Sequence, residues 1–176
     1  MGNPSFVFAP IGVVRSPFTE PAGTPIQPLG AEPVMGKLVV GEAYAEGLAD
    51  LDGFSHIYLL YVFHRAGPPR LSVVPFLDTV PRGVFATRAP SRPNPIGLSL
   101  VRLIGRDGCT LAIEGVDMLD GTPVLDIKPY IPSLEPSAGV RLGWLEGKAE
   151  AMAAQRADDR FRDEDEDRTP GGLVRP

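Results

Sequence analysis

The sequence predicts a mainly β protein, a small antiparallel β-barrel with short helices and a C-terminal helix. The 20 prolines and 20 glycines among its 176 residues interrupt the chain too often for long helices. The apolar stretches between them are short and rich in β-branched and aromatic residues, as is typical of strands. The regular alternation of strands and helices that marks a doubly wound sheet is missing. Many short strands joined by turns favour a barrel or a sandwich.

The first half of the predicted barrel begins with a strand over Phe6–Val14. Pro17–Met35 is rich in proline and glycine and predicts a long loop, of the kind that often carries function. Gly36–Gly41 is the next expected strand, and a short helical turn is expected over Ala43–Leu51. Phe54–His64 is apolar on both alternating faces, which predicts a strand covered on both sides, in a barrel wall or at a subunit contact. A buried helix is the alternative that periodicity leaves open there.

The second half is expected to hold four further strands: Val84–Thr87, Leu98–Ile104, Thr110–Val116 and Pro123–Tyr130. Asp107-Gly108 predicts a two-residue hairpin turn of type I′, and Asp120-Gly121 predicts another turn. Val140–Arg156 predicts a helix, and Asp158–Pro176 is charged and then rich in proline and glycine, as in a loose terminus. We therefore expect a barrel domain over residues 1–135 and a C-terminal helix with a charged tail over 136–176.

Composition limits the classes of function. A hydrophobic fraction of 43% fits a globular protein, and no apolar run is long enough to span a bilayer. We find no signal peptide, and the single cysteine, Cys109, allows no disulfide within the chain, so a cytoplasmic location is expected. The net charge of −5 argues against a generic nucleic-acid binder, although a local basic face remains open.

The densest polar motif is Arg82–Gly97, RGVFATRAPSRPNPIG. Its prolines fix backbone φ angles and stiffen the loop that carries Arg88, Arg92 and Asn94. Because Arg92 precedes a proline, we expect extended backbone and a guanidinium that projects outward. A stiff, arginine-bearing loop on a barrel rim suits binding, while an inert surface turn is the other interpretation.

A second polar motif is Glu114–Tyr130, in which Asp126, Lys128 and Tyr130 alternate and should share one strand face. A solvated outer face is the simpler explanation of that pattern. His56 and His64 lie eight residues apart on a predicted strand, too far for a shared metal, and we expect no metal site.

These motifs occur in one order along the chain with IGVVRSPF (Ile11–Phe18), PIQP (Pro25–Pro28) and GFSHIYLLYVFH (Gly53–His64). The set resembles the TsaA-like family, also called YaeB or TrmO-like. RPNPIG and DGTPVLDIKPY (Asp120–Tyr130) are its most specific parts. Two departures stand out: Ile26 lies where many members carry arginine, and the chain is a short form without the extra C-terminal domain of longer relatives.

The resemblance implies a β-barrel methyltransferase that uses S-adenosyl-L-methionine and forms a homodimer with the cofactor near the subunit interface. The implied reaction is methylation of N6 of threonylcarbamoyl-adenosine beside the anticodon of tRNA. By the family's pattern, cofactor contacts fall on Gln27, Pro28, Leu29, His64, Arg65, Arg88, Leu98, Glu114, Gly115, Val116 and Asp117.

Elementary chemistry adds expected roles. The sulfonium of the cofactor needs an acidic neighbour, which Glu114 or Asp117 would supply. N6 of a modified adenine is a poor nucleophile, so transfer relies on alignment and on an acceptor for its proton. We expect Asn94 to hold N6 and Asp126 to accept the proton, with Tyr130 as a third catalytic candidate. Contacts to phosphate or to the threonyl carboxylate are expected from Arg82, Arg92 and Lys128.

Two other functions stay open at this point. The acidic net charge and the short form are compatible with a barrel that binds S-adenosyl-L-methionine without methylating tRNA. Methylation of a different substrate is the other alternative.

Overall fold

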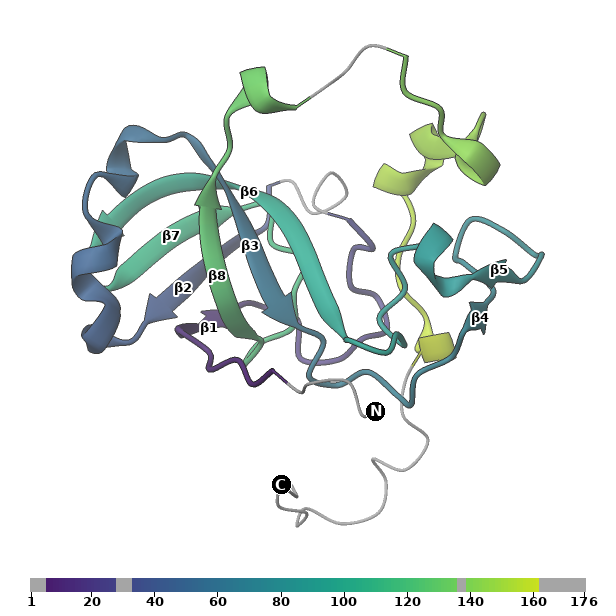
Figure 1. The fold of residues 1–176 in the computed structure, drawn as a ribbon, viewed down its shortest axis with the longest axis horizontal. Helices are drawn as coiled ribbons and strands as arrows, with labels where there is room; N and C mark the ends of the chain where they lie inside the picture. The colour runs from purple at the N-terminus through teal and green to yellow at the C-terminus, as the bar shows by residue number, and fades with distance from the viewer. Residues whose placement is uncertain (1–5, 28–32, 136–138, 162–176) are drawn as a thin grey trace.

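The computed structural model describes residues 6–27, 33–135 and 139–161. It contains a closed antiparallel barrel with the strand order β1-β2-β7-β6-β3-β8, which confirms the predicted fold class (Figure 1). A separate two-stranded sheet, β4–β5, lies beside the barrel. The barrel strands are β1 (Gly12–Arg15), β2 (Met35–Val40), β3 (His56–Val62), β6 (Ile96–Asp107), β7 (Thr110–Glu114) and β8 (Pro123–Pro129), and the small sheet is β4 (Ser72–Val73) with β5 (Arg82–Gly83).

The described helices are all short 3-10 helices. Two of them, η2 (Glu42–Leu48) and η3 (Leu51–Gly53), connect β2 to β3 near the helical turn that the sequence predicts. The others are η4 (Val84–Ala86), η5 (Pro132–Leu134), η6 (Gly143–Leu145), η7 (Ala149–Ala153) and η8 (Asp159–Phe161). None of the helices within the described residues is long and apolar enough to cross a membrane.

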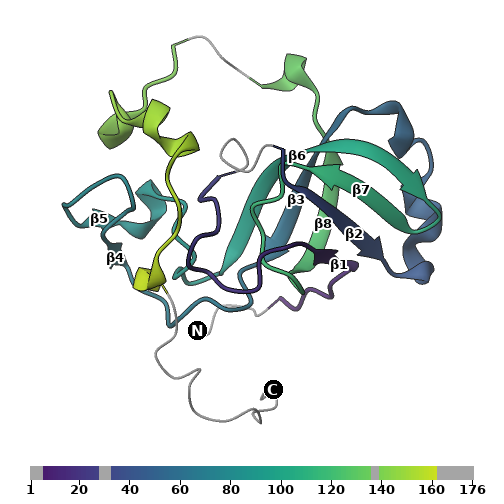
Figure 2. The same cartoon turned by 180° about the vertical axis from the view of Figure 1, so that it is seen from behind.

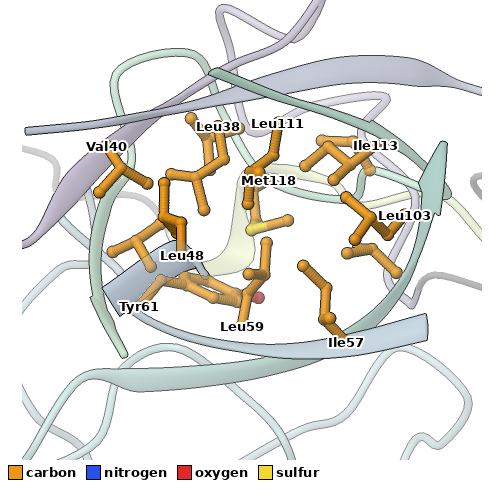
Figure 3. Close-up of a cluster of buried hydrophobic side chains, with 14 residues drawn as sticks. Leu38, Val40, Leu48, Ile57, Leu59, Tyr61, Leu103, Leu111, Ile113 and Met118 are labelled. Carbon is orange, nitrogen blue, oxygen red and sulfur yellow. The ribbon is translucent and has the colours of Figure 1, made fainter. Parts of the chain in front are cut away.

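The main core fills the interior of the barrel (Figure 3). Every barrel strand contributes to it, and β2, β3, β6 and β7 do so with alternate residues. Leu38, Ile57, Leu59, Leu111 and Ile113 are fully buried there. The apolar residue at every second position of these strands therefore marks the face that turns inward.

Strand β3 lies between β6 and β8 and pairs with both. Its inward side chains Ile57, Leu59 and Tyr61 are buried, whereas Tyr58 and Leu60 on the outer face are only half-buried. The segment is thus a strand rather than a buried helix, and its outer face is apolar and partly open.

The β6–β7 hairpin turns one residue later than predicted. Asp107 pairs with Thr110, so its two loop residues are Gly108 and Cys109. Gly108 has a φ of +56° and Cys109 has no positive φ, which matches a type II′ turn rather than type I′. The turn predicted at Asp120-Gly121 is present, with a φ of +79° at Gly121.

Three predicted elements differ from the structure. The first strand begins at Gly12 rather than Phe6. Val84–Ala86 is a 3-10 helix because the hydroxyl and the backbone N–H of Thr87 both donate to the carbonyl of Val84 and close a turn. The helix predicted over 140–156 is broken into η6 and η7, since Gly147 between them adopts a left-handed φ of +72° that a continuous helix excludes.

Candidate functional site

A cavity of about 1000 Å³ opens at one end of the barrel. Its lining comes from segments far apart in sequence: the loop before Pro28, the ends of β3 and β6, the loop from Phe85 to Asn94, residues 117–122 and the C-terminal segment. Most of the lining side chains are apolar, with a few polar groups among them. Such a pocket has the character of a site for a small organic ligand.

Tyr61 and Asp117 line the floor of the cavity, and Ser99, which is buried outside the lining, hydrogen-bonds to both of them. Tyr61 on β3 and Ser99 on β6 point into the barrel from neighbouring strands, and their hydroxyl oxygens lie 3.1 Å apart. The Ser99 hydroxyl donates to Oδ1 of Asp117 at 2.7 Å. Gly97 makes room for the Tyr61 ring, because a Cβ at this position would lie 2.3 Å from two of its ring carbons. The close packing holds the Asp117 carboxyl at the base of the cavity.

Burial raises the pKa of Asp117 to about 7, although the hydrogen bond from Ser99 and the positive charge of Arg88 oppose the rise. Burial and the nearby charge of Asp117 raise the pKa of Tyr61 above its ordinary range. A carboxyl with a pKa near 7 is half protonated at neutral pH. A cation in the cavity would stabilise its charged form.

The rim of the cavity is the loop that follows η4. Its backbone is held by its own side chains: Thr87 Oγ1 accepts from the Ala89 N–H at 3.2 Å. Arg92 donates to the carbonyls of Thr87 and Ala89 at 3.1 and 3.3 Å. The expectation of an outward-projecting Arg92 is therefore wrong, since carbonyls of its own loop capture the guanidinium.

Two arginines hold the first long loop, one from the rim and one from the segment after β3. Arg88 Nη1 donates to Oε1 of Gln27 at 2.9 Å across the cavity mouth. Arg65, just after β3, donates to the carbonyl of Thr19 at 2.6 Å and lies 3.3 Å from the Glu20 carboxylate. The loop around Gln27 is thus held beside the end of β3.

The two histidines do not share a site. His64 lines the cavity, with Nδ1 3.4 Å from Thr122 Oγ1. His56 lies next to Ser55 and packs edge-on against Tyr130. In the part of the chain that the structure describes, no three His, Cys, Asp or Glu side chains gather in a way that would hold a metal ion.

Many of the predicted site residues converge on this one cavity. The residues that line it are Gln27, His64, Arg65, Arg88, Arg92, Asn94, Leu98 and Asp117. Pro28 and Leu29 lie outside the described residues.

The other predicted site residues lie elsewhere. Glu114 forms an ion pair with Arg102 at 3.0 Å. Gly115 is buried and Val116 belongs to the barrel core, and neither lines the cavity. Arg82 is paired with Asp78 at 2.7 Å. A further group is on β8 and just after it, outside the cavity lining: Asp126, Lys128 and Tyr130.

On β8 the shared face that the alternation predicts is the outer one. Asp126 and Lys128 pair across the ladder with Leu60 and Tyr58, and their charged groups lie 2.8 Å apart. Tyr130 packs edge-on against the Tyr58 ring.

Sequence reasoning missed Tyr61, Ser99 and Trp144 as parts of the site. A serine at an inward position of an otherwise apolar strand is a signal that could have pointed to Ser99. Trp144 gave no such signal, because only the tertiary fold brings the C-terminal segment to the cavity.

Comparison with known proteins assigns the family. Residues 13–135 match the model of the tRNA-methyltransferase O N-terminal domain. A probable S-adenosyl-L-methionine-binding protein of Pyrococcus abyssi is 50% identical over 154 residues, covering 88% of this chain and 84% of the relative. The tRNA (adenine(37)-N6)-methyltransferase of Escherichia coli is 41% identical over 146 residues, covering 74% of this chain and 60% of the relative.

A solved structure agrees. The crystal structure of TrmO from Pseudomonas aeruginosa matches with a TM-score of 0.67 and 42% identity, covering 80% of this chain and 62% of that one. The chain thus spans about three-fifths of the length of the Escherichia coli and Pseudomonas relatives. A family match over most of the barrel, together with this shared structure, shows that the chain belongs to the family of the tRNA-methyltransferase O N-terminal domain.

Proposed function

We propose that this chain transfers the methyl group of S-adenosyl-L-methionine to N6 of adenosine 37 in tRNA, with threonylcarbamoyl-adenosine as the form it accepts. The observation that carries the proposal is the carboxyl of Asp117 at the base of a largely apolar cavity rimmed by Arg88, Arg92 and Asn94. The names of the relatives support both the cofactor and the reaction. With tRNA as its substrate, the enzyme would act in the cytoplasm.

The residues around the cavity suit this cofactor. S-adenosyl-L-methionine supplies an electrophilic methyl group on a positively charged sulfur, and Asp117 offers the opposite charge in a poorly hydrated place. Apolar side chains such as Leu98 and Phe63 offer contact for its uncharged parts. Its other proposed contacts are Gln27, His64, Arg65 and Arg88 in the cavity lining, and Pro28, Leu29, Glu114, Gly115 and Val116 by family resemblance.

For the RNA substrate, we propose that Asn94 holds N6 of the target base and that Arg92 keeps the rim in the shape that receives it. Asn94 is exposed at the mouth of the cavity, within the proline-stiffened loop. Asp126 stays the proposed proton acceptor, Tyr130 a proposed catalytic residue, and Lys128 and Arg82 proposed substrate contacts. Asp126, Lys128 and Tyr130 all lie outside the lining of the cavity. These three residues are on the outer face of the barrel, next to the surface proposed below for a second subunit.

The decisive experiment incubates the purified chain with S-adenosyl-L-methionine and two otherwise identical tRNAs. One carries threonylcarbamoyl-adenosine at position 37, and the other carries plain adenosine. We expect mass spectrometry of the nucleosides to show N6 methylation of the modified base only. Methylation of plain adenosine alone would contradict the proposed substrate, and cofactor binding without any tRNA methylation would favour a binding module.

Arg92→Ala should raise KM for tRNA about tenfold with little change in kcat, because the rim loop loses two charge-assisted hydrogen bonds that shape it before RNA binds. Steady-state methylation kinetics measure both constants. Arg15→Ala, which removes an exposed arginine outside the cavity, is the matched control. An unchanged KM for Arg92→Ala would remove Arg92 from the site.

We further propose a homodimer through the outer face of β3 and β6. Along these two strands, apolar outer residues sit opposite one another: Tyr58 with Leu100, Leu60 with Leu98, and Val62 with Ile96. Leu98 and Ile96 are 46% and 42% exposed in the single chain. A contiguous apolar strip of this kind is typical of a subunit contact.

Sedimentation at micromolar concentration should give the mass of two chains. Leu100→Glu should weaken the dimer at least about tenfold, since a buried carboxylate at the contact lacks a partner. Val39→Glu, also at an apolar position on a barrel strand but outside this strip, should leave the dimer intact. A monomer for the unmodified chain at that concentration would contradict the proposal.

A further inference from the structure

The C-terminal segment, residues 139–161, lies outside the part of the chain that matches the family model, yet it forms part of the cavity wall. Figures 1 and 2 show it, in yellow-green, passing the β4–β5 sheet and returning beside the first long loop. The segment contributes Trp144, Leu145, Met152, Ala157, Asp158 and Phe161 to the lining. We call this segment the strap.

The strap is held to the first loop by backbone pairing. The Gly23 N–H donates to the Ala157 carbonyl at 2.8 Å, and the Ala157 N–H donates to the Thr24 carbonyl at 2.8 Å. These bonds lie a few residues before Gln27, so the strap and the loop that carries Gln27 form adjoining parts of the wall.

Its end is held by an apolar anchor. Phe161 is 8% exposed and completes a small cluster with Val73, Val84 and Ala89. Phe76 packs edge-on against Phe161, with the ring centroids 5.2 Å apart. This cluster is separate from the barrel core, and Phe161 of the strap is one of its four buried residues.

Its beginning is held at Trp144. The indole Nε1 donates to the carbonyl of Ala86 at 2.7 Å, which ties the strap to the last residue of η4, directly before the rim loop. Lys148 of the strap lies 3.0 Å from Asp78, which also binds Arg82, and both cations lie within 6 Å of the Trp144 ring centroid. The Trp144 ring is therefore fixed at one edge and lies in the wall of the cavity. Its hydrogen-bond partner, Ala86, is two residues before Arg88 in the sequence.

We propose that the strap forms part of the cofactor-binding site, and that Trp144 both contacts the bound cofactor and positions the rim loop that bears Arg88. The inference rests on the proposed function for the identity of the ligand. The position of the strap between two loops supports the proposal. The strap bonds on one side to the loop that carries Gln27 and on the other to Ala86, just before the loop that carries Arg88. The side chains of Gln27 and Arg88 bond to each other across the mouth of the cavity.

The test uses the fact that Trp144 is the only tryptophan in the chain. Titration of the full-length chain with S-adenosyl-L-methionine should change the tryptophan emission and protect it from iodide quenching, over the concentration range in which calorimetry detects binding. Trp144→Phe keeps an aromatic ring and loses the N–H donor, so its Kd for the cofactor should rise about fivefold. Trp144→Ala should raise the Kd about 30-fold.

Leu142→Ala is the matched control, because Leu142 belongs to the same strap, is 47% exposed and does not line the cavity. Its Kd should equal that of the unmodified chain, and circular dichroism should show that all the variants keep the fold. If the unmodified chain binds the cofactor while its tryptophan emission is unchanged and both Trp144 variants bind equally well, the strap is not a wall of the site. Absence of binding to the unmodified chain would overturn the proposed function, and this inference with it.

Discussion

Asp117→Asn is expected to lower kcat/KM for methyl transfer at least about 100-fold and to weaken cofactor binding by a similar factor. Asparagine keeps the shape of the side chain and a hydrogen-bond acceptor for Ser99, but it lacks the negative charge that the sulfonium requires. Loss of one charge-assisted contact in a poorly hydrated site costs about 2–3 kcal/mol, which corresponds to this factor. Calorimetry with S-adenosyl-L-methionine and methylation kinetics measure the two effects.

Asp120→Asn is the matched control for that change. Asp120 lies three residues after Asp117, and its carboxylate pairs with the exposed Arg15 outside the cavity. Loss of the Asp120 charge should therefore change neither kcat/KM nor the Kd for the cofactor by more than about twofold. Equal cofactor affinity in Asp117→Asn and the unmodified chain would take Asp117 out of the binding site.

The same carboxyl makes stability and binding depend on pH in opposite directions. Because burial raises the pKa of Asp117 from 3.8 to about 7, the folded chain keeps a proton that the unfolded chain has lost between these two values. The free energy of unfolding of the cofactor-free chain should therefore fall as pH rises from about 4 to 7, by on the order of 2–3 kcal/mol. Urea unfolding at several pH values should show this fall in the unmodified chain and lose it in Asp117→Asn.

Cofactor affinity should instead rise as pH increases through 7, since a cation binds the charged carboxylate better than the neutral acid. Calorimetry between pH 6 and 8 tests this direction. A flat affinity profile over that range would contradict a contact between Asp117 and the cofactor's positive charge.

Gly97→Ala is expected to destabilise the fold by about 3 kcal/mol, because its Cβ would lie 2.3 Å from ring carbons of Tyr61. The ring has little room to move: it is 5% exposed, packs edge-on against Phe63 and shares a hydrogen bond with Ser99. For a chain of this size the midpoint of thermal unfolding should fall by about 10 °C. Displacement of Tyr61 should also disturb the floor of the cavity and weaken cofactor binding.

Gly105→Ala, on the same strand, is the control, since nothing lies within 4 Å of a Cβ added there. The double variant Gly97→Ala with Tyr61→Leu provides a second test. Removal of the ring relieves the clash, so the two changes together should cost less than the sum of their separate effects. Additive losses would show that the Tyr61 ring is not what excludes a side chain at position 97.

Several features of the fold were predictable from local patterns. Alternation of apolar residues along Thr110–Glu114 predicts a strand and the face that turns inward, because side chains alternate across a strand whatever its partners are. Phe54–His64 is apolar on both faces, so its pattern predicts a strand without saying which face turns inward. The glycines at positions 108 and 121 mark turns, since they adopt positive φ angles at little cost. The proline-rich loop that carries Arg88, Arg92 and Asn94 was recognisable for the same local reason.

The long-range arrangement was beyond these patterns. Local patterns and the family motifs were enough to predict a mainly β barrel and the residue types around the cavity. Three features became visible only in the folded chain: Arg92 folds back on its own loop, Asp126 and Lys128 face outward, and Trp144 reaches the site from the far end of the chain. They depend on contacts that the folded backbone creates, whereas periodicity and turn chemistry report only on neighbours along the chain.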